Sequence, residues 1–152
     1  MKIEEEIQQS KFQNAYQKLQ INILFTSSWL NQKTTQLLKP YKISWQQFNI
    51  LRILRGRHPE PATVKVLASR MIDKTSNASR LVEKLRQKGY VERSECQEDR
   101  RRVDIVLTEL GIQVVNEASE KMEAEMQARL TGQLGEDEAN VASDILDRMR
   151  DE

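Results

Sequence analysis

The sequence predicts a mainly α-helical protein with one small antiparallel β-hairpin, and three observations support this fold class. Glycine and proline are rare, at five and three of 152 residues, whereas the straight-chain residues that favour helices are abundant. Apolar residues recur at helical spacing along most of the chain, and two short strand-like runs flank the hexapeptide QEDRRR at 97–102. With 38% apolar residues, this length suits a single domain, residues 1–152, with one core.

The first predicted element is a long helix from Ser10 to about Lys39, which Pro40 should end. Its apolar stripe contains Phe12, Tyr16, Leu19, Ile23 and Leu30. A second helix is expected over ISWQQFNILRILRGR, with Gly56 and the following loop as its stop. Its inward residues should be Ile43, Phe48, Leu51 and Leu54.

Two shorter helices follow, and together they indicate a helix-turn-helix. Thr63 can cap a helix over TVKVLASRM, and Asp73 is the expected N-cap of the next helix, over DKTSNASRLVEKLRQKG. Only two or three residues should separate them, and Gly89 should stop the second. The inward stripes are Val64, Leu67, Ala68 and Met71, and then Ala78, Leu81, Val82 and Leu85.

The runs YVERSEC and VDIVLT are the predicted strands, and QEDRRR becomes the tip of their hairpin. In the second run Val103, Ile105 and Leu107 alternate with residues of the opposite face. Helical spacing returns at Thr108, and a break at TGQLGEDE separates the last two amphipathic helices.

Charge is segregated along the chain, although the formal net charge is only +1. Residues 49–103 contain 14 Lys and Arg against 7 acids, whereas residues 104–152 contain 4 against 13. Such a chain can present a cationic face to a polyanion. The alternative interpretation is ordinary solvated helix faces that happen to be unevenly charged.

If the fourth helix buries its apolar stripe, its opposite face is short, polar and cationic. That face carries Lys74, Thr75, Ser76, Asn77, Arg80 and Lys84. Small donors and acceptors beside an arginine suit the base edges of the major groove, so double-stranded DNA is the expected partner. The alternative is that the small polar residues are present only because they favour a helix start.

Three adjacent arginines, Arg100, Arg101 and Arg102, repel one another at the hairpin tip unless a polyanion is present. An arginine in the minor groove meets an enhanced negative potential, and its neighbours can neutralise phosphates. Asp99 is suited to orient the Arg101 guanidinium through a charge-assisted fork. We therefore expect a minor-groove wing beside a major-groove helix.

These two segments closely resemble the MarR family of winged-helix transcriptional regulators. DKTSNASRLVEKLRQKGYVER is similar to the family's recognition helix, and EDRRRVDIVLTELG is similar to its wing signature Asp-x-Arg. The resemblance implies a homodimer on a pseudopalindromic operator, with residues 1–42 and 109–152 as dimerisation helices and residues 43–108 as the DNA-binding lobe. It also implies a minor-groove arginine at Arg101, braced by Asp99, while Arg102 is assigned only a phosphate contact.

The resemblance further implies a transcriptional regulator, expected to be a repressor, that a small phenolic or aromatic effector can release from DNA. Trp29, Tyr41 and Trp45 are the candidates to line an effector pocket. Simple packing between the lobes is the favoured alternative for these aromatics. A winged-helix module that docks an acidic protein partner is the second functional hypothesis.

Other classes of function have little support in the sequence. Cys96 cannot form an intramolecular disulfide, and we expect an inert, partly buried thiol. The only histidine, His58, makes a metal site or a Ser-His-Asp enzyme improbable, and no cofactor motif is present. No apolar run approaches the roughly 20 residues needed to cross a bilayer, and MKIEEEIQQS is unlike a signal sequence, so we expect a cytoplasmic protein.

Overall fold

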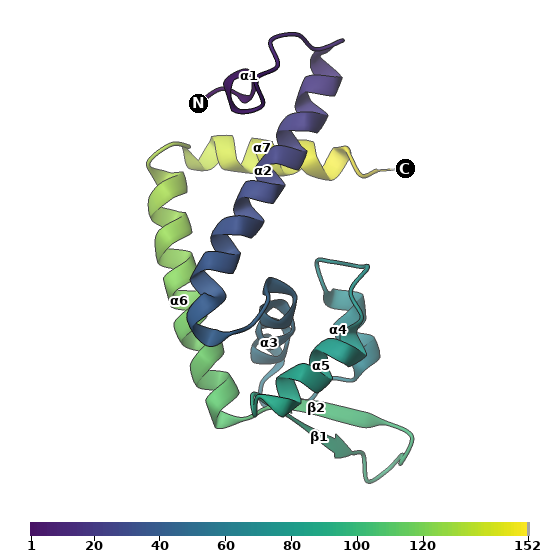
Figure 1. The fold of residues 1–152 in the computed structure, drawn as a ribbon. Coiled ribbons are helices and arrows are strands. Elements are labelled where there is room, and N and C mark those ends of the chain that lie inside the picture. The colour runs from purple at the N-terminus through teal and green to yellow at the C-terminus, as the bar shows by residue number, and fades with distance from the viewer. Residues whose placement is uncertain (152) are drawn as a thin grey trace.

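The computed structural model describes residues 1–151 and contains α-helices, one 3-10 helix and a two-stranded antiparallel sheet (Figure 1). The elements are α1 (Ile3–Glu6), α2 (Ala15–Leu38), η1 (Lys39–Tyr41), α3 (Trp45–Arg57), α4 (Val64–Arg70), α5 (Ala78–Gln87), β1 (Val91–Glu95), β2 (Val103–Leu107), α6 (Glu109–Thr131) and α7 (Glu136–Arg148). The predicted fold class is confirmed. None of the described helices combines the length and the apolar character that crossing a bilayer requires.

The elements form a lobe and two long arms (Figure 1). Helices α3, α4 and α5 pack with the β1–β2 hairpin and form the lobe. The two arms are α2 and α6, and both contact α3. At the far end of the arms, Leu146 of α7 lines a hollow together with residues of α2. The lobe therefore presents α5 and the hairpin at the end of the molecule that is remote from α7.

The core lies between α3, α5, the hairpin and the first turns of α6. The inward residues predicted around α3 are buried, as are most of those predicted on α5 and β2: Ile43, Phe48, Leu51, Leu54, Ala78, Val82, Leu85, Ile105 and Leu107. Ala68 is instead exposed, because α4 is short and buries only Leu67 among its own residues. The predicted periodicity is therefore right for α3, α5 and β2.

Helix α2 begins later than its apolar spacing suggested. The predicted start was Ser10, whereas the helix starts at Ala15, after Asn14 accepts a hydrogen bond from the Gln17 N–H (2.9 Å). An asparagine in this position satisfies a helix N–H that would otherwise lack a partner. The preceding segment contains α1, which an ion pair between Lys18 and Glu4 (2.5 Å) ties to α2.

The start of α5 corrects a second expectation, because Asp73 is not its N-cap. The helix begins at Ala78, and the Asn77 side chain accepts a hydrogen bond from the Arg80 N–H (3.1 Å). Asp73 accepts two hydrogen bonds from Thr75, from its N–H (3.0 Å) and its hydroxyl (2.7 Å). These local bonds hold the chain in a turn and compete with helix formation. Residues 71–77 therefore form a longer connection than predicted, which we call the recognition turn.

Two of three other helix signals are confirmed. The Thr63 side chain caps α4 by accepting a hydrogen bond from the Val66 N–H (3.2 Å). Gly89, with a positive φ of 77°, follows α5 as its stop. Gly56 does not end α3, which continues to Arg57.

The hairpin has the predicted strands and tip. Val91 pairs with Leu107 and Glu95 with Val103, so residues 96–102 form the tip. A further pairing that no local pattern indicated joins Ile105 of β2 to Ala62, through hydrogen bonds of 2.8 and 3.0 Å. The hairpin is thus fixed to the loop before α4 as well as to its own partner strand.

The base of the hairpin is fastened to its neighbours at three points. The Thr108 hydroxyl donates to the Gly89 carbonyl (2.6 Å), and the Tyr90 hydroxyl donates to the Tyr41 carbonyl (3.3 Å). Gly111, in the first turn of α6, lies so close to the Tyr90 carbonyl that a Cβ there would overlap the oxygen. Only a glycine allows α6 to approach the hairpin this closely.

We predict that Gly111→Ala lowers the free energy of unfolding by about 1–3 kcal/mol or more, because the added methyl group forces α6 away from the hairpin. Urea denaturation at one fixed protein concentration measures this change. Gly56→Ala is the matched control, since no atom lies within 4 Å of a Cβ at that helical position. It should be neutral or stabilising by up to about 1 kcal/mol. Equal stability of wild type and Gly111→Ala would contradict the close approach.

Candidate nucleic-acid interface

A polar hollow of about 360 Å³ lies between the recognition turn, α5 and the start of α3. It is lined by Gln46, Asp73, Thr75, Ser76, Asn77, Arg80, Leu81 and Lys84. Five of the six residues that the sequence predicted for the recognition face therefore lie together. Lys74 does not line the hollow, because its ammonium group donates to the Ser69 carbonyl (2.5 Å).

Gln46 and Asp73 also line the hollow, although neither was predicted as a member of the site. Asp73 was predicted only as a helix cap. Gln46 has no local signal, because its neighbour in the hollow is far along the chain: its Nε2 donates to Oδ2 of Asp73 (3.4 Å).

The recognition turn is tied to α3 at two consecutive residues. Asn49 accepts a hydrogen bond from the Ile72 N–H (2.9 Å), and Gln46 donates to Asp73. The hydrogen bond from the Thr75 hydroxyl lowers the pKa of Asp73 the most, followed by the bond from the Thr75 N–H. Burial raises this pKa, but by less. Asp73 is therefore a carboxylate at neutral pH, and it holds the turn through acceptor atoms only.

Helix α5 presents two cations that have no acidic partner within residues 1–151. Its buried side carries Ala78, Val82 and Leu85, so Arg80 and Lys84 project outward. Two other cations nearby share one carboxylate: Arg86 (2.8 Å) and Arg93 (3.6 Å) both pair with Glu83. The positive charge of this face is thus concentrated beside the recognition turn.

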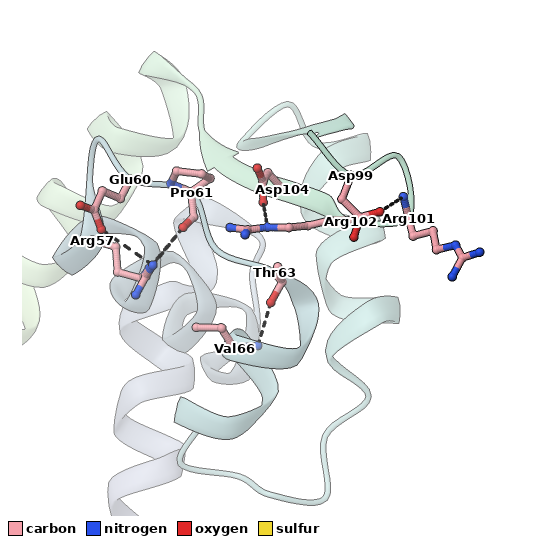
Figure 2. A network of polar contacts seen from close by, with 9 residues as sticks. All are labelled: Arg57, Glu60, Pro61, Thr63, Val66, Asp99, Arg101, Arg102 and Asp104. Carbon is pink, nitrogen blue, oxygen red and sulfur yellow. Dashed lines mark hydrogen bonds and ion pairs between the residues drawn. The ribbon is translucent and has the colours of Figure 1, made fainter. Parts of the chain in front are cut away.

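The tip of the hairpin differs from the expectation for Asp99. Its Oδ1 accepts a hydrogen bond from the backbone N–H of Arg101 (3.0 Å), not from the guanidinium (Figure 2). Its carbonyl also accepts the Arg102 N–H (3.0 Å). An aspartate two residues before an N–H readily closes such a turn, which explains why the expected fork does not form. Asp99 shapes the backbone of the tip, and the Arg101 side chain extends away from the lobe (Figure 2).

The three arginines of the tip have different environments. Arg102 pairs with Asp104 (3.0 Å), whose side chain is only 14% exposed. That hydrogen bond and charge raise the pKa of Arg102, so it stays fully charged but already has an anionic partner. Arg100 and Arg101 are exposed, and neither forms an ion pair within the described residues.

The loop that pairs with β2 is itself anchored by an arginine. The Arg57 guanidinium donates to the Pro61 carbonyl (3.2 and 3.3 Å) and lies 3.9 Å from Glu60 (Figure 2). Ala62, the next residue, is the one that bridges to Ile105. This contact links the end of α3 to the hairpin.

The three aromatics proposed for one effector pocket lie in different places. Trp29 stacks with Arg129 (5.3 Å from guanidinium carbon to ring centre) beside a hollow between α2 and the end of α6. Trp45 lines a different hollow of about 240 Å³, together with Phe48, Arg52 and Met122. The Tyr41 ring packs against the Lys121 ammonium (5.3 Å) and lines neither hollow.

Neither Cys96 nor His58 belongs to a larger polar cluster. Cys96 is half-buried at the end of β1, and His58 is exposed in the loop after α3. Among residues 1–151, no group of three or more His, Cys, Asp or Glu side chains is arranged to hold a metal ion.

Comparison with known proteins places this interface in a family. Residues 43–103 match the model of the MarR family. The HTH-type transcriptional regulator SarZ of Staphylococcus aureus is 28% identical over 140 residues, which cover 91% of this chain and 89% of that protein. SarZ of Staphylococcus haemolyticus is 32% identical over 89 residues, or 59% of each chain.

Two solved structures share the fold over nearly the whole chain. The organohalide-sensing regulator RdhR in its 2,4-dichlorophenol-bound form has a TM-score of 0.79 at 20% identity, covering 93% of this chain and 85% of that chain. The S. aureus MepR–DNA complex has a TM-score of 0.73 at 26% identity, covering 91% and 96%. With the lobe, the recognition turn and the arginine tip described above, these findings show that residues 43–103 form a MarR-family winged helix-turn-helix region, and that the chain is similar over nearly its whole length to HTH-type transcriptional regulators.

Proposed function

We propose that this regulator acts as a homodimer that binds a pseudopalindromic DNA operator and represses transcription. In each protomer, α5 and the recognition turn enter the major groove, and the hairpin tip enters the adjacent minor groove. The MepR relative was solved in complex with DNA, which supports DNA as the partner. Residues 43–108 supply the DNA-binding lobe.

The observation that carries this proposal is the pattern of paired and unpaired cations. Arg80 and Lys84 on α5 and Arg101 on the tip have no acidic partner in the described chain, whereas Arg86, Arg93 and Arg102 do. Unpaired cations gain most from a polyanion, because they release its counterions without first breaking an ion pair. Arg80, Lys84 and Arg101 belong to the two elements that reach into DNA grooves in winged-helix proteins.

Dimerisation is supported by apolar side chains that the single chain leaves exposed on its arms. Tyr16 (82% exposed) and Leu24 (64%) lie on α2, and Val141 (56%) and Met149 (49%) lie on or just after α7. Covering such surface is favourable at about 25 cal/mol per Å². We assign dimerisation to residues 1–42 and 109–152, although residue 152 lies outside the described part of the chain.

A small aromatic or phenolic effector fits the hollow around Trp45 better than it fits the surroundings of Trp29 or Tyr41. Arg52 supplies a cation there, and Phe48 and Met122 supply apolar surface. Asn49 lines the same hollow and accepts the Ile72 N–H of the recognition turn. An occupant that competes for Asn49 would loosen the turn and weaken DNA binding. The relative RdhR was solved with 2,4-dichlorophenol bound.

We predict a dimer at micromolar concentration, with recognition helices roughly 34 Å apart on the DNA, the spacing of one helical turn. Sedimentation equilibrium measures the mass directly. A folded species at the monomer mass of 17.8 kDa alone would rule this prediction out.

We predict that Arg80→Ala lowers discrimination between the operator and a mismatched site by about 1–3 kcal/mol, because its bidentate base contact is lost. Lys84→Ala should weaken specific and nonspecific binding alike and reduce the salt slope by about one per protomer, as expected for a phosphate contact. Duplex titrations over a range of salt concentrations distinguish the two patterns.

The matched control on the same helix is Arg86→Ala, since Arg86 is already paired with Glu83. It should change DNA binding less than either substitution. Equal binding of operator and scrambled duplexes by the wild type would instead favour an acidic protein as the partner.

We predict that Arg101→Ala costs more operator affinity than Arg102→Ala, because Arg102 is held by Asp104 whereas Arg101 is free to enter the minor groove. Asp99→Ala should also weaken binding, although it removes a negative charge near DNA. Without the Asp99 acceptor, the Arg101 backbone must be ordered on contact. Titration of a labelled operator at fixed salt provides the comparison.

Asp99→Asn separates the shape of the tip from its charge. It removes the same negative charge but keeps an oxygen for the Arg101 N–H, so it should bind at least as well as wild type. If Asp99→Ala also bound as well as wild type, the tip would act only as a cluster of charge.

A further inference from the structure

The recognition turn contains two side chains whose hydrogen-bonding capacity is already half used. The Thr75 oxygen lies 2.7 Å from Oδ1 of Asp73, and the Asn77 Oδ1 lies 3.1 Å from the Arg80 nitrogen. Both residues are exposed and line the hollow beside α5. What each can still offer to DNA follows from which atom of the pair must carry the hydrogen.

For Thr75 the donor is the hydroxyl, because an ionised carboxylate carries no hydrogen. Asp73 is kept ionised by the bonds it accepts from Thr75 and by the amide group of Gln46. The hydroxyl hydrogen of Thr75 is therefore committed to Asp73. Only the lone pairs of its oxygen remain for a base.

For Asn77 the donor is the Arg80 backbone N–H, which cannot accept. The amide oxygen of Asn77 must face it, so this oxygen is committed to capping α5. The amide NH₂ group is left for a base. Thr75 and Asn77 thus present opposite hydrogen-bonding capacities although both residue types can ordinarily donate and accept.

We infer that Asp73 is a specificity-determining residue: by fixing Thr75 as an acceptor, it selects a base that presents an amino group in the major groove. This inference rests on the proposed function. Adenine and cytosine present an amino group there, whereas guanine and thymine present an oxygen. The contacted strand should therefore carry A or C at the position read by Thr75, and Asn77 should face an acceptor such as a purine N7 or a base oxygen.

The ties to α3 keep this arrangement in place when DNA binds. Breaking the bond between Thr75 and Asp73 would leave a carboxylate beside DNA with fewer donors, and bonds to charged groups are the stronger ones. Asn49 and Gln46 hold the turn at Ile72 and Asp73, directly before Thr75. Asp73 itself need not touch a base, so it is a positioning residue.

The test selects bound sequences from a pool of DNA duplexes randomised over both half-sites, with wild type and three variants. Thr75→Val keeps the shape of the side chain and removes the hydroxyl, so the position whose preference it abolishes is the one that Thr75 reads. At that position the wild type should favour A or C over G or T by roughly five- to tenfold.

Asp73→Ala and Asp73→Asn form a matched pair, because both remove the same negative charge and only Asn keeps an acceptor for Thr75. Asp73→Ala frees the hydroxyl to donate or accept, so the preference at this one position should fall to about twofold or less, while other positions keep theirs. Asp73→Asn should retain the wild-type preference. A merely structural role would lower affinity at all positions together.

Any one of three outcomes would overturn the inference. The wild type could prefer G or T at the DNA position that Thr75 reads, Thr75→Val could change the preference at no DNA position, or Asp73→Ala could leave the preference unchanged. If Asp73→Ala fails to fold, the wild-type preference and Thr75→Val still decide. A wild-type protein that enriches no sequence at all would overturn the proposed function, which distinguishes that failure from this one.

Discussion

The double pairing of β2 is the constraint on which the helix-turn-helix lobe depends. This strand pairs with β1 on one side and with Ala62 on the other, and Ile105 at its centre is fully buried. Through Ala62 it fixes the loop that leads into α4, and through Thr108 it leads directly into α6. The helix-turn-helix, the hairpin and one long arm therefore share a single element, and α6 meets the hairpin directly where Gly111 approaches the Tyr90 carbonyl.

Carboxylates determine which cations of the lobe are available to a partner. Glu83 pairs with Arg86 of α5 and with Arg93 of β1, and Asp104 pairs with Arg102 along the hairpin. Asp73 and Asp99 form no ion pair with the arginines that follow them and instead hold turns through backbone and hydroxyl groups. The acids of this basic segment thus fall into two groups. Glu83 and Asp104 form ion pairs with arginines, whereas Asp73 and Asp99 accept hydrogen bonds that fix the backbone next to the remaining cations.

The recognition turn and the hollow around Trp45 are physically connected through α3. Gln46 and Asn49 lie one turn apart on this helix, and each bonds to the recognition turn. Because α3 also contacts α2 and α6, its position depends on the arms as well as on the lobe. The arms, α3 and the recognition turn are thus joined by direct contacts.

The sequence by itself determined the fold class, the order of the main helices and strands apart from α1 and η1, the hairpin with its arginine tip, and the periodicity of the buried faces of α3, α5 and β2. Each of these depends on local spacing or on residues that act within one turn, such as the Thr63 cap and the Gly89 stop. The choice between Asp73 and Asn77 as the cap of α5 did not follow from the sequence pattern, because both residue types are good caps. In the structure Asp73 closes a local turn with Thr75 and also accepts a hydrogen bond from Gln46, which lies 27 residues away in sequence. The pairing of Ile105 with Ala62 and the separate sites of Trp29, Tyr41 and Trp45 likewise depend on distances between elements, which a one-dimensional pattern does not contain.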